Sequence, residues 1–289
     1  MGPRKRGPMD GSELVRKHVA YMHRRGLREN TILLRTRTLR RLELHAGKSL
    51  LRITIDDVRA FIDRLDDQGS RATERTQLRS FYKWAALEGY CDDPTFRLEP
   101  IRKRKYLPRP IDDDALALAL VDPPERVRPM LWLMAYAGLR SHDLAQLRGE
   151  HLMWDRTPPI IYIEDSKGGK PRTVPMAPQI VALRPTLPTK GWLFPYRDGR
   201  PGHITAHYVS KLCNDYLRSI GIPDTAHALR HWAVTEWYRC SGHDLVVTQE
   251  LAGHENIATT RLYTWTDPGA SVETVGLMRE LRPSLRVAG

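Results

Sequence analysis

Residues 227–263 of this chain read HALRHWAVTEWYRCSGHDLVVTQELAGHENIATTRLY. The spacing of apolar residues predicts three helices, at about 225–239, 244–252 and 256–264. His227 and Arg230 are three residues apart, so both lie on one face of the first of these helices. A Gly-His turn at His254 precedes Tyr263 by nine residues. The stretch therefore predicts a helical domain that displays two histidines, an arginine and a tyrosine at fixed spacing.

Two further polar motifs precede this stretch. Ala137-Gly138-Leu139-Arg140 follows an apolar segment that is expected to be a buried helix. The strand-like segments Ile160–Ile163 and Arg172–Pro175 predict a β-hairpin. Its turn carries two lysines, Lys167 and Lys170. Taken singly, each motif is more often structural than catalytic, so only their order and spacing together indicate chemistry.

In that order and spacing, the motifs resemble those of the tyrosine recombinases, which include phage integrases and the bacterial recombinases that resolve chromosome dimers. The resemblance covers about residues 106–281. It implies a mainly α fold with a small β-hairpin or sheet (α+β), in which a helical core-binding domain precedes the catalytic domain. It also implies six catalytic residues, which are Arg140, Lys167, His227, Arg230, His254 and Tyr263.

The resemblance gives each of these residues a role in cutting DNA. Arg140 and Arg230 would bind the phosphate oxygens, because planar guanidinium groups match phosphate geometry. Tyr263 would attack phosphorus and form a 3′-phosphotyrosyl link. His227 would accept the proton of the tyrosine. The chain has 11 tyrosines, and three without an upstream Gly-His turn are expected in the core: Tyr208, Tyr216 and Tyr238.

The remaining roles concern the leaving group and the support of the site. Lys167 would protonate the leaving 5′ oxygen as general acid, and a Lys-Gly-x-Lys pattern favours it over Lys170. His254 would hydrogen-bond the phosphate, and Asp143 would orient the catalytic groups. No cofactor is expected: the sequence offers no metal-ligand spacing and no Gly-rich phosphate loop.

Basic charge is concentrated in the first third of the chain. Residues 1–105 hold 25 Lys and Arg against 14 Asp and Glu, whereas the remaining residues hold 21 against 20. This asymmetry fits a segment that lies along double-stranded DNA, and a solvated basic surface explains it equally well. Four helices are expected in this region, and the fourth carries basic residues at steps of four on one face. The candidate DNA contacts are Arg71, Arg75, Arg79 and Lys83, followed by Arg102, Lys103, Arg104 and Lys105.

The expected organisation has five parts: a basic disordered start at 1–11, a helical DNA-binding domain at 12–96, a basic linker at 97–110, a catalytic domain at 111–269 and a C-terminal helix and tail at 270–289. The resemblance implies that this tail docks on a neighbouring subunit in a homo-tetramer on DNA. About 11 residues precede the first predicted helix, so we expect no arm-binding domain of the kind that many phage integrases carry.

The sequence favours a site-specific DNA recombinase for phage or mobile-element integration and excision. A chromosome-dimer-resolving recombinase, a type IB topoisomerase and a DNA-binding protein that has lost catalysis remain alternatives. The three cysteines are widely spaced and predict reduced thiols in a cytoplasmic protein. No apolar stretch is long enough to span a membrane, so no membrane association is expected.

Overall fold

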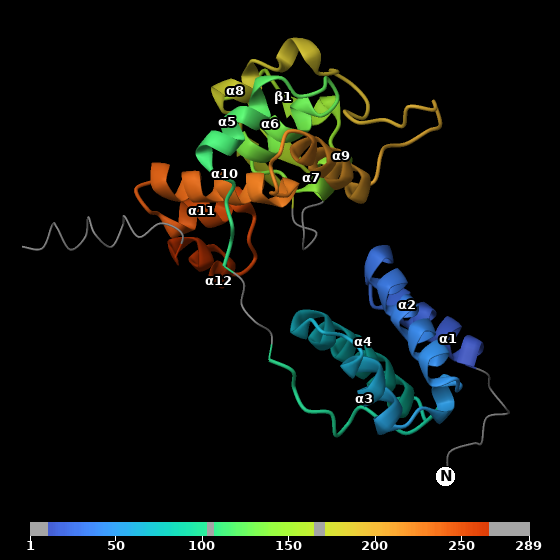
Figure 1. The fold of residues 1–289 in the computed structure, drawn as a ribbon. Helices are drawn as coiled ribbons and strands as arrows, with labels where there is room; N and C mark the ends of the chain where they lie inside the picture. The colour runs from blue at the N-terminus through green and yellow to red at the C-terminus, as the bar shows by residue number, and fades with distance from the viewer. Residues whose placement is uncertain (1–10, 103–106, 165–170, 266–289) are drawn as a thin grey trace, which may run out of the picture. The chain divides into compact units, whose positions relative to one another are not determined.

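The computed structural model describes residues 11–102, 107–164 and 171–265. The chain divides into two compact units, Met1–Tyr106 and Leu107–Gly289, and the division falls inside the stretch 97–110. Both units are mainly helical, and the second contains a small antiparallel sheet, which confirms the predicted fold class (Figure 1). Several predicted features lie outside the described residues, namely Lys103, Arg104, Lys105, Lys167, Lys170 and the C-terminal helix and tail at 270–289.

The described N-terminal unit is a small helical bundle. Its elements are α1 (Gly11–Arg24), α2 (Glu29–Ala46), the 3-10 turn η1 (Leu50–Arg52), α3 (Ile55–Asp63) and α4 (Gln68–Leu87). α4 begins at Gln68, because the Asp67 carboxylate accepts a hydrogen bond from the Ser70 N–H at 2.6 Å. The apolar faces of the helices meet in one core that includes Leu14, Leu39, Leu42, Phe61, Leu78 and Phe81.

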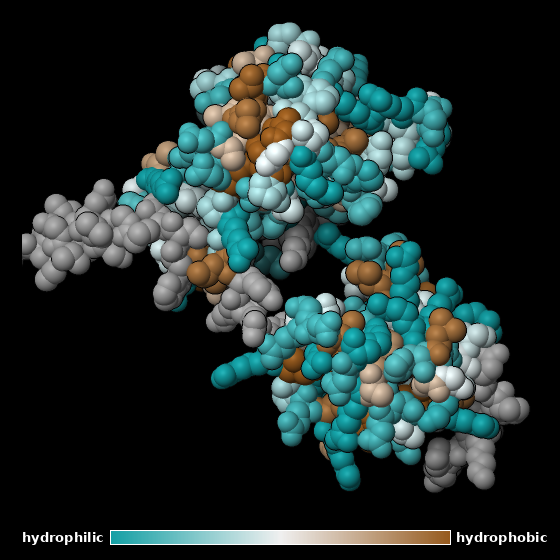
Figure 2. All heavy atoms as spheres, in the orientation of Figure 1, coloured by the Kyte–Doolittle hydropathy of each residue, from teal (hydrophilic) through white to brown (hydrophobic). Residues whose placement is uncertain are grey.

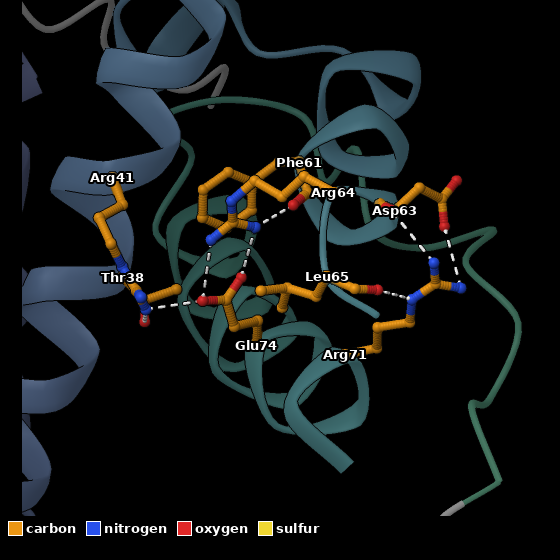
Figure 3. A network of polar contacts seen from close by, with 8 residues as sticks. All are labelled: Thr38, Arg41, Phe61, Asp63, Arg64, Leu65, Arg71 and Glu74. Atoms are coloured by element: carbon orange, nitrogen blue, oxygen red, sulfur yellow. Dashed lines mark hydrogen bonds and ion pairs between the residues drawn. The ribbon is translucent and has the colours of Figure 1, made fainter. Parts of the chain in front are cut away.

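A buried carboxylate on α4 ties three parts of this bundle together (Figure 3). The Glu74 side chain is only 7% exposed. It accepts hydrogen bonds from both terminal nitrogens of Arg64, at 2.9 and 3.1 Å. It also pairs with Arg41 of α2 at 2.7 Å. The Arg64 guanidinium lies 3.6 Å from the centre of the Phe61 ring. Two arginines therefore compensate one buried carboxylate.

The described part of the second unit is built around α6 (Arg128–Tyr136), whose residues Met130, Leu131, Leu133 and Met134 are almost completely buried. The other helices are α5 (Asp113–Val121), α7 (Ser141–Ala145), α8 (Pro178–Val181), α9 (Ala206–Ser219), α10 (Ala226–Cys240), α11 (Leu245–Ala252) and α12 (Ile257–Thr260). Short 3-10 turns occur at η2 (Gly149–His151), η3 (Arg184–Thr186) and η4 (Arg261–Trp265). α10 packs against α6, α9 and α11, and α11 packs against α12.

The sheet has the order β1-β2-β3 and is antiparallel throughout. Its strands are β1 (Leu152–Met153), β2 (Ile160–Ile163) and β3 (Arg172–Pro175). The register pairs Ile161 with Val174, and both side chains are buried. The predicted hairpin is therefore present, and β1 is a third strand that the sequence did not indicate.

Three sequence expectations need correction. The helix predicted over 256–264 consists of α12 followed by the 3-10 turn η4. Gly11, expected in a disordered start, is the first residue of α1. Tyr208 is 43% exposed and does not belong to the core. Tyr216 is half-buried and its hydroxyl donates to the Ala119 carbonyl at 3.2 Å, and Tyr238 is buried, as predicted.

Hydrophilic side chains dominate the face of both units drawn in Figure 2, with apolar side chains between them. The exposed apolar residues include Leu44, Leu87 and Phe96. Within the described ranges, no helix is long and apolar enough to cross a membrane.

Candidate active site

A sharp turn after α6 positions Arg140 at the start of α7. Gly138 has φ +55°, which favours glycine, and a Cβ atom there would lie 2.4 Å from the Trp237 ring of α10. The guanidinium of Arg140 reaches the C-terminal end of α11. Its Nη2 lies 3.4 Å from the carbonyl oxygen of Ala252 and 3.5 Å from that of Gly253. The Gly-Leu-Arg motif thus directs an arginine to the end of a distant helix.

A second arginine, Arg230 of α10, reaches the same place and is only 2% exposed. Its Nη2 donates to the Ala252 carbonyl at 2.7 Å, and its Nη1 donates to the Gly138 carbonyl. Burial and the nearby guanidiniums of Arg140 and Arg172 lower the pKa of Arg230 to about 9. This cluster of positive charge is partly desolvated, so it is suited to bind an anion.

The turn after α11 brings His254 beside Arg230. Gly253 has φ +58°, and a Cβ atom there would lie 2.7 Å from Cδ of Arg172. His254 Nδ1 lies 2.9 Å from the Thr260 hydroxyl, and its Nε2 lies 3.3 Å from Arg230 Nη2. Burial and the charge of Arg230 are the main causes that lower the pKa of His254 to about 3. His254 is therefore neutral at pH 7.

Tyr263 lies in η4 and is 3% exposed. Its hydroxyl oxygen is 2.7 Å from Nδ1 of His231, and its ring is stacked against that of His254 with centroids 6.1 Å apart. Burial raises the pKa of Tyr263, and the charges of Arg230 and Arg140 oppose this increase. The tyrosine hydroxyl is therefore protonated at neutral pH.

His231 is a site residue that sequence reasoning missed. It follows Arg230 directly and lies one helical turn after His227, and the two imidazole rings have centroids 4.4 Å apart. His227 is exposed, whereas His231 is half-buried. Burial lowers the pKa of His231 to about 4, with smaller contributions from His227 and Arg230. The available signal was the four-residue spacing from His227, which places both rings on one helical face.

Asp143 and Arg172 form a buried ion pair beside the arginine cluster. The Asp143 side chain is 1% exposed, and its Oδ2 accepts hydrogen bonds from the Arg140 N–H at 3.1 Å and from Arg172 Nη2 at 2.9 Å. Arg172 lies in β3, and its side chain is 8% exposed. Arg172 was also missed from the sequence. The ion pair links the sheet to the backbone of the residue that precedes α7.

The side chains of Arg140, Arg230, His231, His254 and Tyr263 line one cavity of about 270 Å³, which Asp143 and Arg172 do not line. Five of the six predicted catalytic residues line it, namely Arg140, His227, Arg230, His254 and Tyr263. The sixth, Lys167, lies outside the described residues. In the part of the chain that the structure describes, no group of three or more His, Cys, Asp or Glu residues could hold a metal ion.

The predicted DNA contacts on α4 have partners inside their own unit. Three arginines donate to backbone carbonyls: Arg71 to Asp63 at 3.0 Å, Arg75 to Leu98 at 2.5 Å and Arg79 to Thr95 at 3.4 Å. Burial, followed by the charge of Arg79, lowers the pKa of Arg75. Lys83 and Arg102 are exposed. The three arginines therefore hold neighbouring chain segments against α4, whatever else they contact.

Comparison with known proteins identifies the family to which a chain with these residues belongs. The pattern of the phage integrase family matches residues 116–269. The chain belongs to this family. The N-terminal SAM-like domain of phage integrases matches residues 17–89. The chain is therefore a site-specific recombinase of the tyrosine type, an enzyme that cleaves and rejoins DNA.

Relatives and solved structures agree with this assignment. The recombinase is 31% identical to tyrosine recombinase XerD of Caulobacter vibrioides over 76% of this chain and 79% of that protein. It is 34% identical to tyrosine recombinase XerC of Azotobacter vinelandii over 73% and 75%. Its fold resembles a lambda integrase dimer bound to a COC′ core site, with a TM-score of 0.70, 16% identity and coverage of 95% and 80%. It also resembles the Tn1549 transposon integrase in complex with a circular intermediate DNA, with a TM-score of 0.68, 18% identity and coverage of 93% and 100%.

Proposed function

We propose that this recombinase cuts DNA at a defined site through Tyr263 and stores the broken bond as a 3′-phosphotyrosyl link. The observation that carries the proposal is the shared cavity, in which the Tyr263 hydroxyl lies with Arg140, Arg230 and His254. A phosphodiester repels nucleophiles because it is an anion. Two guanidiniums at the attacked phosphate offset its charge and stabilise the additional charge of the transition state.

The two arginines now donate to the carbonyl oxygen of Ala252, at 3.4 Å from Arg140 and 2.7 Å from Arg230. A phosphate oxygen is a stronger acceptor than a neutral carbonyl, because hydrogen bonds between charged groups are about twice as strong. The scissile phosphate would therefore replace the carbonyl as the main partner. His254, which is neutral, would then donate to the same phosphate.

Two proton transfers accompany the cut. A histidine of α10 takes the proton of Tyr263 as the hydroxyl attacks phosphorus. His227 is the acceptor that the family resemblance implies. Lys167 donates a proton to the leaving 5′ oxygen, and Asp143 orients Arg140 through its backbone N–H at 3.1 Å. Rejoining reverses these steps, so no external energy source is needed.

We further propose that the enzyme acts as a homo-tetramer on two DNA duplexes, with residues 270–289 docked on a neighbouring subunit. A lambda integrase tetramer bound to a Holliday junction has a similar fold, with a TM-score of 0.66, which supports the proposal. The candidate DNA contacts of the N-terminal unit are the exposed Lys83 and Arg102, with Lys103, Arg104, Lys105 and the three arginines of α4.

The biological role that we propose is integration and excision of a phage or mobile element. The fold similarity to the Tn1549 transposon integrase supports this role. Resolution of chromosome dimers is the second candidate, and the relatives named XerC and XerD are equally compatible with it. The two roles differ in the DNA that the enzyme recognises: one mobile-element junction and one host site, or two copies of one chromosomal site.

The test is covalent capture of DNA from a random pool. The purified full chain is incubated with nicked duplexes of randomised sequence, and protein-linked strands are recovered and sequenced. We expect a 3′ link to Tyr263 and a shared sequence around the cut, and we expect no adduct from Tyr263→Phe. Adducts formed by the Phe variant would disprove the proposed nucleophile. Relaxation of supercoiled plasmid without sequence preference would instead indicate a type IB topoisomerase.

A further inference from the structure

The hydroxyl of Tyr263 is held by His231. The oxygen lies 2.7 Å from Nδ1, and the ring centroids are 5.6 Å apart at 47°. Both residues are removed from bulk water, since Tyr263 is 3% exposed and His231 is half-buried. The contact is therefore a short hydrogen bond in a protected place, between the attacking atom of the proposed reaction and a base.

The ionisation of the two groups allows the hydroxyl to donate this hydrogen bond. Burial raises the pKa of Tyr263 above its ordinary value, so the phenol keeps its proton. The pKa of His231 is lowered to about 4, so the imidazole is neutral at pH 7. In the tautomer that carries its hydrogen on Nε2, the ring accepts the hydroxyl hydrogen at Nδ1, which is the arrangement that a general base requires.

His227 occupies a different position on the same helix. Its side chain is exposed, and it lies one turn before His231, towards the N-terminus of α10. The positive end of the helix dipole lies there, next to Arg140 and Arg230 at the cavity. This place favours contact with the incoming phosphate anion, and it leaves the proton of Tyr263 to His231.

We propose that His231 is the general base of the reaction, and this rests on the proposed function of Tyr263. The O–H bond of Tyr263 breaks and its proton goes to Nδ1 of His231, while the phenolic oxygen bonds to phosphorus. The bond from phosphorus to the 5′ oxygen breaks, and the general acid of the proposed function protonates that oxygen. During rejoining, the 5′ hydroxyl gives its proton back to this acid as it attacks phosphorus, and His231 returns its proton to the departing phenolic oxygen. His227 contacts a phosphate oxygen in both steps.

The charged groups around His231 explain why its basicity would depend on bound DNA. The titratable and charged groups that share its cavity are His227 and Arg230 on α10, Tyr263 in η4, His254 and Glu255 after α11, and Arg140. The net charge of these groups is positive, which opposes a proton on the ring. A phosphate bound between the arginines offsets that charge, so His231 becomes a stronger base when DNA is in place.

The experiment compares asparagine substitutions at two histidines of one helix. The Oδ1 atom of asparagine replaces the Nδ1 acceptor but cannot carry a proton. Cleavage by H231N, H231A and H227N is measured in single turnovers on a nicked suicide duplex that contains the captured sequence. Each variant is also made with 2,3-difluorotyrosine at position 263, because this phenol is more acidic and depends less on a base. His207 is exposed on α9, and H207N is the surface control.

We expect H231N and H231A to cleave about a hundredfold more slowly than the unchanged enzyme. Fluorotyrosine should restore most of this loss in H231N and little of the loss in H227N, and the pH profile of H231N should lack the step due to its base. Duplex binding by H231N and H231A should equal that of the unchanged enzyme, and melting curves verify that all variants fold. If H231N does not fold, H231Q takes its place in the comparison.

Three results would overturn the proposal: cleavage by H231N within threefold of the unchanged enzyme, a slow H231N that fluorotyrosine does not restore, or stronger restoration in H227N. The proposed function fails separately. In that case the unchanged enzyme gives no adduct, or Tyr263→Phe still gives one, before His231 is tested.

Discussion

Both units of the molecule place two arginines around one acceptor, but they compensate the charge differently. In the N-terminal unit, the carboxylate of Glu74 pairs with Arg41 at 2.7 Å and with Arg64 at 2.9 Å. In the catalytic unit, Arg140 and Arg230 point instead at the neutral carbonyl of Ala252. In the first arrangement, the charges of the arginines are compensated by a carboxylate of the same unit. The second directs two guanidiniums at one neutral acceptor, which suits it to bind an anion.

The largest expected effect concerns Arg230. Lysine at this position keeps the charge but loses the planar pair of donors that binds a phosphate. We expect Arg230→Lys to cleave a suicide duplex about a thousandfold more slowly, with DNA binding nearly unchanged. The matched control is Arg218→Lys on α9, whose side chain is 65% exposed and which should have no effect. A cleavage rate within tenfold of normal would show that Arg230 serves only the fold.

The second prediction concerns the buried carboxylate of Glu74 in the N-terminal unit. Glu74→Gln removes the counter-charge of two arginines that are 54% and 27% exposed, so the free energy of unfolding should fall by about 3 kcal/mol, the lower end of the range for buried pairs. Urea denaturation of the full chain measures the loss. Glu29→Gln, at a side chain that is 83% exposed, should change it by less than about 0.5 kcal/mol. Replacing Glu74, Arg41 and Arg64 together by methionine should restore most of the stability, and failure to do so would mean that packing dominates.

The third prediction concerns a histidine buried in the N-terminal unit. Among the described residues, neither ring nitrogen of His18 has a hydrogen-bond partner, and burial together with Arg35 lowers its pKa from 6.5 to about 4. The unfolded chain therefore binds more protons between these pH values, and the free energy of unfolding falls as the pH drops from 6.5 to 4. The expected contribution is about 3 kcal/mol. His18→Leu should flatten this part of the stability curve measured by denaturant titration; equal curves for both proteins would contradict the assignment.

The smallest expected effect tests directly whether the arginines of the catalytic unit bind an anion. Inorganic phosphate at about ten times its Kd should stabilise the catalytic unit by about 1.4 kcal/mol, which raises its melting temperature by about 3 °C. Sodium chloride of equal ionic strength is the control. Arg140→Gln should abolish the increment in a calorimetric scan. An unchanged increment in this variant would place the phosphate elsewhere.

The sequence predicted candidate catalytic residues from their order and spacing, and five of the six line one cavity in the structure. It did not predict Arg172, whose partner Asp143 lies 29 residues earlier and is brought close only by the packing of the sheet on α7. Helical spacing placed Arg75 and Arg79 on one face of α4. It gave no indication that Thr95 and Leu98 would cover that face with their carbonyl groups. Residue spacing therefore could not predict the contacts between segments that are far apart in the sequence.

The carbonyl of Ala252 has a consequence for how the site would bind a phosphate. It accepts hydrogen bonds from both arginines, at 3.4 Å from Arg140 and 2.7 Å from Arg230. The end of α11 therefore lies where the guanidinium donors converge, and those donors must exchange this backbone oxygen for a phosphate oxygen before both arginines can bind an anion.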